Sequence, residues 1–238
     1  MMDTQVQAHI FLADQRGRAE TELFRSCHTF NFGAYSAEGR TPFGALCLLN
    51  DDLLRPGASL TMQVEQPMQV VLMPIVGGLE YAVEGVTHFL EPGQAGTLAL
   101  PAGMNYMVNN PYPNELINCL QLWFTMPESG VFSTVRQIDF DLSLPNTLQP
   151  FLTIIPTEQA VPTGFIGRFA GREEGTYPIR PLVAGETRRV FVFVLQGVFE
   201  VANRLLHEKD GLALTYQQAD EVEFEALSND ALLLLLTC

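Results

Sequence analysis

The stretch from Pro56 to Tyr81, PGASLTMQVEQPMQVVLMPIVGGLEY, contains apolar runs between turn-forming residues. The Pro56-Gly57 pair and the Gly77-Gly78 pair are turn signals, because glycine adopts backbone conformations that are closed to other residues. Between these turns, apolar residues recur at alternating positions, which is typical of a β-strand with one buried face. The stretch therefore predicts strands of a β-barrel.

The rest of the chain repeats this pattern of short apolar runs between turn residues. Signals such as Asn109-Asn110-Pro111 and Asp210-Gly211 separate the runs, and no long helical period interrupts them. Many short strands with regular turn signals indicate an all-β barrel or sandwich. The clearest expected strands are residues 44–49, 69–73, 96–100, 116–124, 189–195 and 231–236.

The sequence also contains an internal repeat. IVGGLEYAV, from Ile75, is followed by Pro92-Gly93 and then LAL at 98–100; VLQGVFEVA, from Val194, is followed by Asp210-Gly211 and then LAL at 212–214. Both copies predict strand, glycine turn, strand, tight turn and strand, with alternating apolar residues filling one barrel. We therefore expect two homologous barrels, at residues 1–124 and 166–238. Residues 125–165, which are rich in proline, are expected to form the linker.

Composition excludes several classes of partner. Thirteen Lys and Arg residues oppose 27 Asp and Glu residues, giving a net charge of −14. Such a charge repels nucleic-acid backbones and favours solubility. No apolar run reaches membrane-spanning length, and no secretory signal is visible, so we expect no membrane association and a cytoplasmic protein. The pattern leaves a monomer and a dimer equally open.

Three blocks in the N-terminal half resemble pirin proteins. RSCHTFNFG, from Arg25 to Gly33, resembles their RxxHTFxFG opening. Phe43-Gly44, LLNDD at 48–52 and Pro56-Gly57 resemble the next pirin block, FGxLRVLNEDxVxPG, and LQLW at 120–123 resembles the close of the pirin N-terminal barrel. The resemblance implies a bicupin fold, in which two antiparallel jelly-roll barrels follow each other in the chain.

The same resemblance implies a metal site whose ligands are missing here. Pirins bind iron or a similar metal through an HPHxxxEI motif and an AGxGxxHSE motif. Matched in register, the first motif places its histidines on Gln63 and Glu65 and its glutamate on Gln69, and the second places its histidine and glutamate on Val108 and Asn110. Carboxamides and an aliphatic side chain are poor substitutes for imidazoles, so we expect no metal cofactor.

These positions suggest a pocket in place of the metal. We expect the polar residues among them to face the interior of the first barrel, where an unpaired polar group costs roughly 1–3 kcal/mol. They either bind a small organic molecule or satisfy each other and ordered water. The expected pocket residues are Gln63, Glu65, Gln69, Val108 and Asn110, with Tyr106 and Met107 as walls.

Two classes of function remain. The favoured one is a non-catalytic, pirin-like module that binds a small organic molecule or a protein. The alternative is an enzyme: either an oxidoreductase of the quercetin 2,3-dioxygenase type with an unusual metal set, or a metal-free enzyme with Glu65 as general acid or base. The histidines form no catalytic arrangement, and His28 within HTFNFG is expected to be structural.

Overall fold

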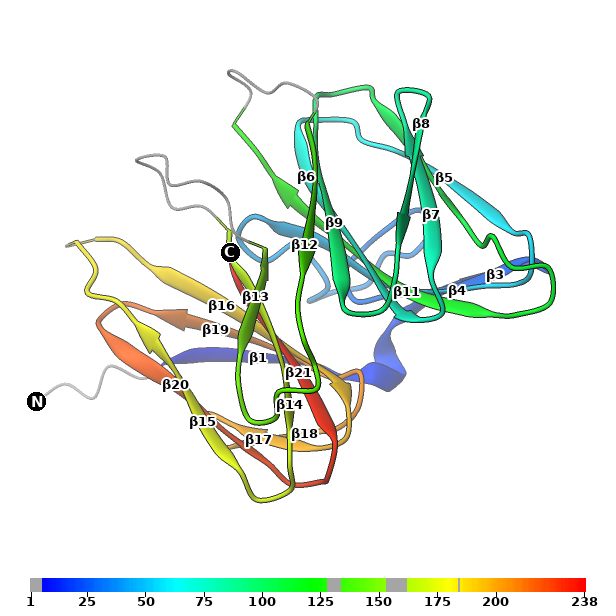
Figure 1. Cartoon of the computed structure of the whole chain (residues 1–238). Coiled ribbons are helices and arrows are strands. Elements are labelled where there is room, and N and C mark those ends of the chain that lie inside the picture. The colour runs from blue at the N-terminus through cyan, green and yellow to red at the C-terminus, as the bar shows by residue number, and fades with distance from the viewer. Residues whose placement is uncertain (1–5, 128–133, 153–161, 184) are drawn as a thin grey trace, which may run out of the picture. The chain divides into compact units, whose positions relative to one another are not determined.

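The computed structural model describes residues 6–127, 134–152, 162–183 and 185–238. These residues form β-strands and one short 3-10 helix, η1 (Ala13–Gln15), which confirms the all-β class. Figure 1 shows the strands, which belong to two compact units. We call Arg16–Phe140 the first barrel, and Met1–Gln15 together with Asp141–Cys238 the second barrel. No helix among the described residues has the length and apolarity needed to cross a membrane.

The first barrel consists of a seven-stranded and a four-stranded sheet, both antiparallel. The large sheet has the order β12-β9-β6-β11-β4-β3-β2 and the small sheet has the order β5-β10-β7-β8. Their bounds are β2 (Gly17–Glu20), β3 (Phe24–His28), β4 (Leu46–Leu54), β5 (Ser59–Gln63), β6 (Met68–Val76), β7 (Leu79–Val83), β8 (Val86–Leu90), β9 (Gln94–Leu100), β10 (Asn105–Asn109), β11 (Ile117–Thr125) and β12 (Thr134–Asp139).

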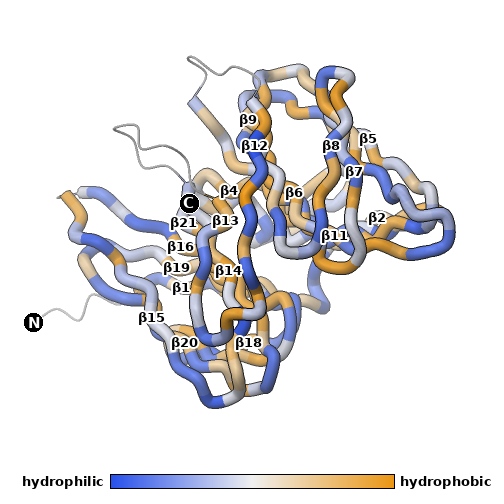
Figure 2. Tube along the Cα trace, in the orientation of Figure 1, coloured by the Kyte–Doolittle hydropathy of each residue, from blue (hydrophilic) through white to orange (hydrophobic). Residues whose placement is uncertain are grey.

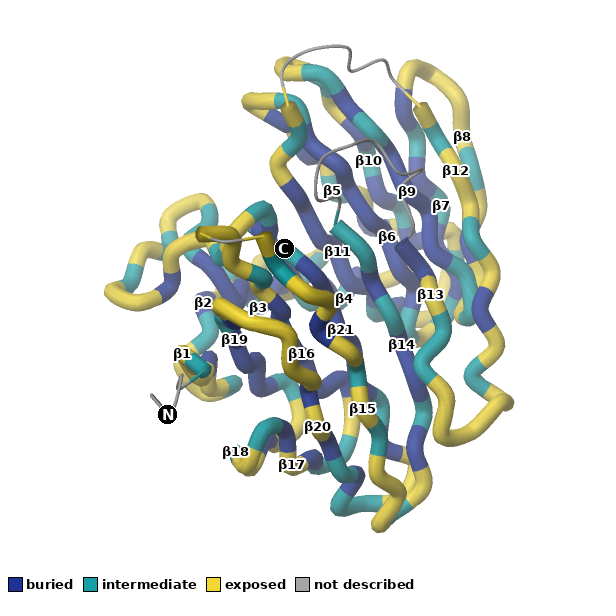
Figure 3. Tube along the Cα trace, turned by 90° about the vertical axis from the view of Figure 1, so that its left-hand side faces the viewer, coloured by how far each residue is buried: buried dark blue, intermediate teal, exposed yellow. Residues whose placement is uncertain are grey.

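The apolar side chains at alternating positions of these strands fill the space between the two sheets. Met68, Val70 and Leu72 of β6 belong to one buried cluster with Val108 of β10 and Trp123 of β11. Because successive side chains of a strand point to opposite faces, the intervening residues of β6 face away from this cluster. Figure 2 shows the pattern as orange and blue segments that follow each other along single strands. In Figure 3, β11 is largely buried, whereas β12 at the sheet edge is mostly exposed.

The second barrel consists of a six-stranded and a four-stranded sheet. Their orders are β1-β19-β16-β21-β14-β13 and β15-β20-β17-β18. Their bounds are β1 (Gln7–Phe11), β13 (Gln149–Leu152), β14 (Gly164–Phe169), β15 (Glu174–Ile179), β16 (Arg188–Gln196), β17 (Phe199–Val201), β18 (Arg204–Leu206), β19 (Gly211–Tyr216), β20 (Asp220–Ala226) and β21 (Ala231–Thr237).

The two barrels share one topology, as the internal repeat predicts. The order β9-β6-β11-β4-β3 of the first large sheet corresponds to β19-β16-β21-β14-β13 of the second, and β5-β10-β7-β8 corresponds to β15-β20-β17-β18. The repeated glycine turns occupy matching places: Gly77 follows β6 with φ 71°, and Gly197 follows β16 with φ 81°. These positive angles favour glycine, so the repeat preserves a backbone requirement at each turn.

The observed units differ from the expected domain boundaries at the N-terminus and in the expected linker. β1 lies in the region assigned to the N-terminal barrel, but it pairs with β19 of the second barrel. β12 lies in the expected linker, but it pairs with β9 of the first barrel, and β13 and part of β14 also come from that linker. Alternation predicts that a segment is a strand, whereas its partner sheet depends on contacts far away in the sequence.

Candidate functional site

Two of the expected pocket residues lie on the outer surface of the first barrel and not in its interior. Gln63 and Glu65 are both exposed, and Gln63 Nε2 donates a hydrogen bond to the carbonyl oxygen of Gly103 at 3.4 Å. The interior positions belong to their neighbours: Met62 is 6% exposed and Val64 is 0% exposed, and both belong to the core cluster. The expectation that Gln63 and Glu65 face the interior is therefore wrong by one residue, which is enough to reverse the face of a strand.

Gln69 is buried, but it does not face the core of the first barrel. Its neighbours Met68 and Val70 belong to the core cluster, so the side chain of Gln69 points from the other face of β6. The prediction of an interior Gln69 is also wrong, although its burial, at 6% exposed, is consistent with the sequence pattern.

The side chain of Asn110 stabilises the loop that follows β10 through hydrogen bonds to the backbone. Its Nδ2 donates to the carbonyl oxygens of Leu54 at 3.1 Å and Glu115 at 2.7 Å. Its Oδ1 accepts from the backbone N–H of Tyr112 at 2.9 Å. The side-chain amide therefore uses its hydrogen bonds on the backbone. Asn110 has a structural role here, whereas the sequence predicts a ligand-binding role.

Val108 and Tyr106 do face the interior of the first barrel. Val108 is 0% exposed and Tyr106 is 1% exposed, and both belong to the core cluster. Met107, which lies between them in β10, is half-buried and points to the opposite face. Of the seven expected pocket residues, the structure therefore brings only these two into the interior together.

The residues at the five matched positions do not fit a transition metal. Val108 offers no lone pair, and the amide of Asn110 is already used by the backbone. Iron, nickel or zinc sites take several imidazole, thiolate or carboxylate ligands directed at one point, and Glu65 supplies a single exposed carboxylate. Among the residues that the structure describes, no three His, Cys, Asp or Glu side chains group closely enough to hold a metal ion.

A chain of hydrogen bonds runs through the same interior, and sequence reasoning missed it. Trp123 Nε1 donates to the Tyr106 hydroxyl at 2.7 Å, and this hydroxyl donates to Gln121 Oε1 at 2.6 Å. Gln121 Nε2 then donates to Asp52 Oδ2 at 2.6 Å. We call these four residues the interior polar chain. The signal was present in β11, where Gln121 alternates with Cys119 and Trp123 and therefore must face inward with them.

Asp52 is the acidic end of this chain. Its side chain is 0% exposed, and burial raises its pKa from 3.8 to about 6. Side-chain hydrogen bonding to Ser26 and Gln121 lowers the pKa and so opposes this shift. Among the described residues, Asp52 Oδ1 has no hydrogen-bond partner. The carboxyl group is consequently poised to change charge in mildly acidic solution.

The nearby charges on Asp51 and Arg16 act on Asp52 in opposite directions. Asp51 raises the pKa of Asp52, and Arg16 lowers it. Arg16 Nη1 lies 3.6 Å from Asp51 Oδ2, and Asn118 Nδ2 donates to Asp51 Oδ1 at 2.6 Å. The positive charge of Arg16 is therefore shared with Asp51, which leaves burial as the dominant effect on Asp52.

His28 has the structural role expected from the sequence. Its side chain is buried, and Nδ1 lies 2.9 Å from Asn50 Oδ1 and 3.3 Å from Ser26 Oγ. Its ring lies 5.2 Å from that of Phe32, measured between centroids, and the Phe32 ring lies 6.0 Å from that of Trp123. Burial lowers the pKa of His28, which favours the neutral ring at neutral pH.

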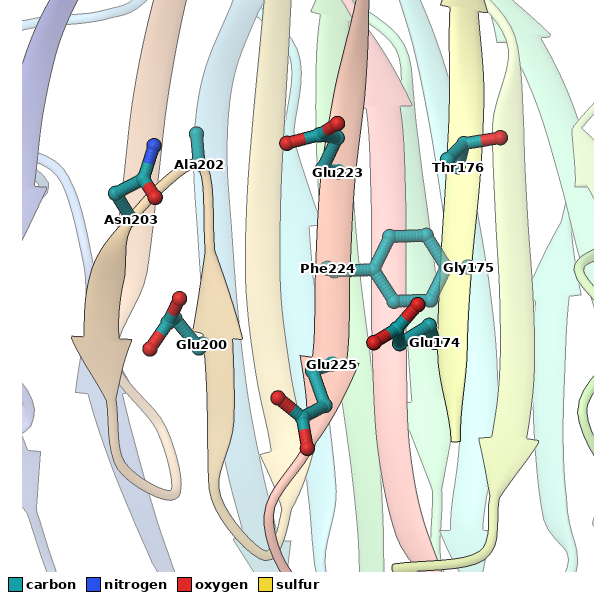
Figure 4. A pocket seen from close by; sticks show the side chains of 9 residues that line it. All are labelled: Glu174, Gly175, Thr176, Glu200, Ala202, Asn203, Glu223, Phe224 and Glu225. Atoms are coloured by element: carbon teal, nitrogen blue, oxygen red, sulfur yellow. The ribbon is translucent and has the colours of Figure 1, made fainter. Parts of the chain in front are cut away.

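The second barrel carries a hollow of about 300 Å³ on its four-stranded sheet. Figure 4 shows the side chains that line it, among them four glutamates from three neighbouring strands: Glu174, Glu200, Glu223 and Glu225. Glu225 lies directly opposite both Glu174 and Glu200 in the strand register, so like charges are neighbours here. Arg172 Nη1 offsets part of this charge at 3.2 Å from Glu225 Oε1.

Comparisons with known proteins agree with this architecture. Residues 165–236 match a family model described as the quercetinase C-terminal cupin domain. A provisionally named quercetin 2,3-dioxygenase of Pasteurella multocida is 23% identical over 221 residues, which cover 89% of this chain and 92% of the relative. The bacterial pirin YhhW from Escherichia coli, solved in complex with nickel(II), superposes with a TM-score of 0.82 at 21% identity, over 97% of this chain and 98% of that chain.

Two barrels of one topology, of which the second matches a cupin domain, define this protein as a bicupin. The sequence match extends across both barrels, and the relatives found in this way are quercetinase-like and pirin-like proteins. In sequence and in fold the chain is similar to pirin and quercetinase-like proteins. The expected bicupin fold is confirmed, and these matches support the expected resemblance to pirins.

Proposed function

We propose that this pirin-like protein works without a transition metal and acts as a binding module. The observation that supports the proposal is the filling of the first barrel with apolar side chains. Met62, Val64 and Val108 occupy the interior around the positions where the family motifs place metal ligands. Without convergent donors, a metal ion gains too little to offset the loss of its hydration.

The names of relatives favour a different activity. An E. coli relative named quercetin 2,3-dioxygenase is 25% identical over 130 residues, which cover 54% of this chain and 56% of the relative. YhhW was solved with nickel(II). We infer that this chain has kept the scaffold of such proteins and has lost the dioxygenase chemistry, because side chains that do not fit a metal stand at the matched positions.

We further propose that a protein partner binds to the outer surface. A small organic molecule inside the first barrel has less support, because Val108 and Tyr106 fill the interior and Gln63 and Glu65 point outward. Cys27, Cys47 and Cys119 are free thiols. Free thiols favour a reducing compartment, so we propose the cytoplasm as the location.

The decisive experiment measures metal content and turnover together. The protein is purified without a histidine tag, and iron, nickel, copper and manganese are quantified by mass spectrometry, with YhhW purified in parallel as the positive control. We expect far less than one metal ion per chain, no quercetin oxygenation, and no rise in melting temperature when nickel(II) is added, because only ligands that bind the folded state stabilise it. One metal ion per chain, or quercetin oxygenation above the protein-free rate, overturns the proposal.

The metal-free enzyme with Glu65 as acid or base has no structural support. Glu65 is exposed, and catalytic acids and bases are usually held in clefts that shift their protonation. If any metal-independent turnover is detected, the rate of the Glu65→Gln variant tests this alternative directly. A complete loss of rate in that variant would favour the enzyme over the binding module.

A further inference from the structure

Asp52 is enclosed by the first barrel from every side. It lies on β4, an internal strand of the large sheet, and is paired with Ser26 of β3 on one side and Cys119 of β11 on the other. Its side chain is 0% exposed. The polar and titratable groups that face or influence it are Ser26 from β3, Asp51 from β4, Tyr106 from β10, Cys119 and Gln121 from β11, and Arg16.

Donor and acceptor chemistry gives the interior polar chain a direction. An indole N–H only donates, so the Tyr106 hydroxyl accepts from Trp123 and gives its own hydrogen to Gln121. The carbonyl of Gln121 is then the acceptor, and its NH₂ group donates to Asp52 Oδ2. Because Oδ2 accepts in this arrangement, the proton of neutral Asp52 sits on Oδ1, which has no partner among the described residues. The preference for the neutral form therefore comes from the burial of the carboxyl group, because burial disfavours its charge.

Loss of that proton leaves a buried negative charge on Asp52 with too few hydrogen-bond donors around it. Both oxygens of an ionised carboxylate accept hydrogen bonds, and Oδ1 has no partner among the described residues. The Ser26 hydroxyl interacts with the Asp52 side chain and also lies 3.3 Å from His28 Nδ1. This hydroxyl or a water molecule can donate to Oδ1 only if the carboxylate or its neighbours move. Any movement of Gln121 breaks its bond to the Tyr106 hydroxyl, which is also the acceptor for Trp123.

We propose that Asp52 is a proton-operated switch whose ionisation rearranges the interior polar chain as far as Trp123. The hydrogen bonds of the interior polar chain are intact when Asp52 is neutral. When Asp52 is charged, these bonds between β4, β10 and β11 weaken, and the packing of the first barrel becomes less close. The raised pKa of Asp52, about 6, places the change in the mildly acidic range. The switch is independent of the proposed function, because it involves none of the positions matched to the metal ligands.

Trp123 reports on the switch directly, because it is the only tryptophan of the chain and forms one end of the interior polar chain. Its fluorescence is recorded from about pH 4.5 to about pH 8, a range that brackets the change in Asp52. We expect the emission maximum to move to longer wavelength as pH rises, with a midpoint near the pKa of Asp52, about 6. The Asp52→Asn variant should keep the low-pH spectrum throughout, since asparagine mimics the neutral acid.

Two control variants make the assignment specific. Glu65→Gln removes one exposed carboxylate from the same barrel and should leave the transition unchanged. His28→Gln removes a buried imidazole whose ring contacts Phe32, which in turn contacts Trp123, and should also preserve the transition. A transition that survives in Asp52→Asn, or that disappears in His28→Gln, overturns the proposal.

A second measurement needs no variant of Asp52. Infrared difference spectra of the wild-type protein follow the C=O band of a protonated carboxylic acid, which disappears on ionisation. We expect a buried, proton-exchange-protected band to disappear with the same midpoint as the fluorescence change. A fluorescence change without loss of such a band, or a spectrum that does not respond to pH, contradicts the switch even if Asp52→Asn does not fold.

Discussion

Replacement of Asp52 by asparagine should make the unfolding free energy less dependent on pH. The folded state holds the proton of Asp52 up to a pKa of about 6, whereas the ordinary pKa of an aspartate side chain is 3.8. Between these values the unfolded chain loses its proton first, so ionisation favours unfolding. The contribution of Asp52 to stability is therefore complete below about pH 3.8, and it is lost as pH rises through about 6.

The size of this effect follows from the two pKa values. Their difference, 6 − 3.8, is 2.2 units, and at 1.36 kcal/mol per unit it corresponds to about 3 kcal/mol. Above pH 6, the Asp52→Asn variant should therefore approach 3 kcal/mol more stability than the wild type. Below pH 3.8 the two proteins should be nearly equal, because the wild-type carboxyl is then neutral in both states.

Urea denaturation at a series of pH values provides the assay, with unfolding of the first barrel followed through Trp123. The net charge of −14 makes the whole chain respond to pH, so the informative quantity is the difference between variant and wild type. Glu65→Gln is the matched control, because it makes the same charge change at an exposed position. A difference between Asp52→Asn and wild type that stays constant from acidic to neutral pH would refute the reasoning.

Three further substitutions test the packing around the site. Tyr106→Phe leaves two buried groups without a partner and should cost about 2–5 kcal/mol in urea denaturation; a loss below about 1 kcal/mol would contradict the interior polar chain. Asn110→Ala removes three hydrogen bonds to the backbone and should lower the melting temperature, with no change expected if Asn110 instead served a ligand. Gly175→Ala places a methyl group 2.4 Å from the buried Phe224 ring and should destabilise the second barrel by about 1–3 kcal/mol, whereas Thr176→Ala on the exposed face should change stability little.

The sequence predicts the fold well because strands and turns have local signatures. Each of the six runs identified from alternation overlaps a strand, and the repeated glycine turns at Gly77 and Gly197 mark equivalent places in the two barrels. The repeat also predicts that the barrels share a topology, which the sheet orders confirm. These features depend on neighbours within a few residues, and a single sequence contains that information.

The site is harder to predict because it depends on which face a residue takes and on partners far away. A motif match fixes the position of Gln63 in the chain, but a one-residue difference in strand alternation decides whether its side chain enters the barrel. The interior polar chain joins residues of β4, β10 and β11, and Asp52 lies 69 positions from Gln121. No local pattern indicates that such residues will meet.

The pairing of β1 with β19 has a consequence for biosynthesis. Gln7 is paired with Thr215, so β1 is synthesised well before the strand that it joins. At about 5–20 residues per second, the roughly 200 intervening residues take on the order of 10–40 s to synthesise. During that interval the nascent N-terminal segment has no sheet to join, and it is a natural target for chaperones that hold extended peptides.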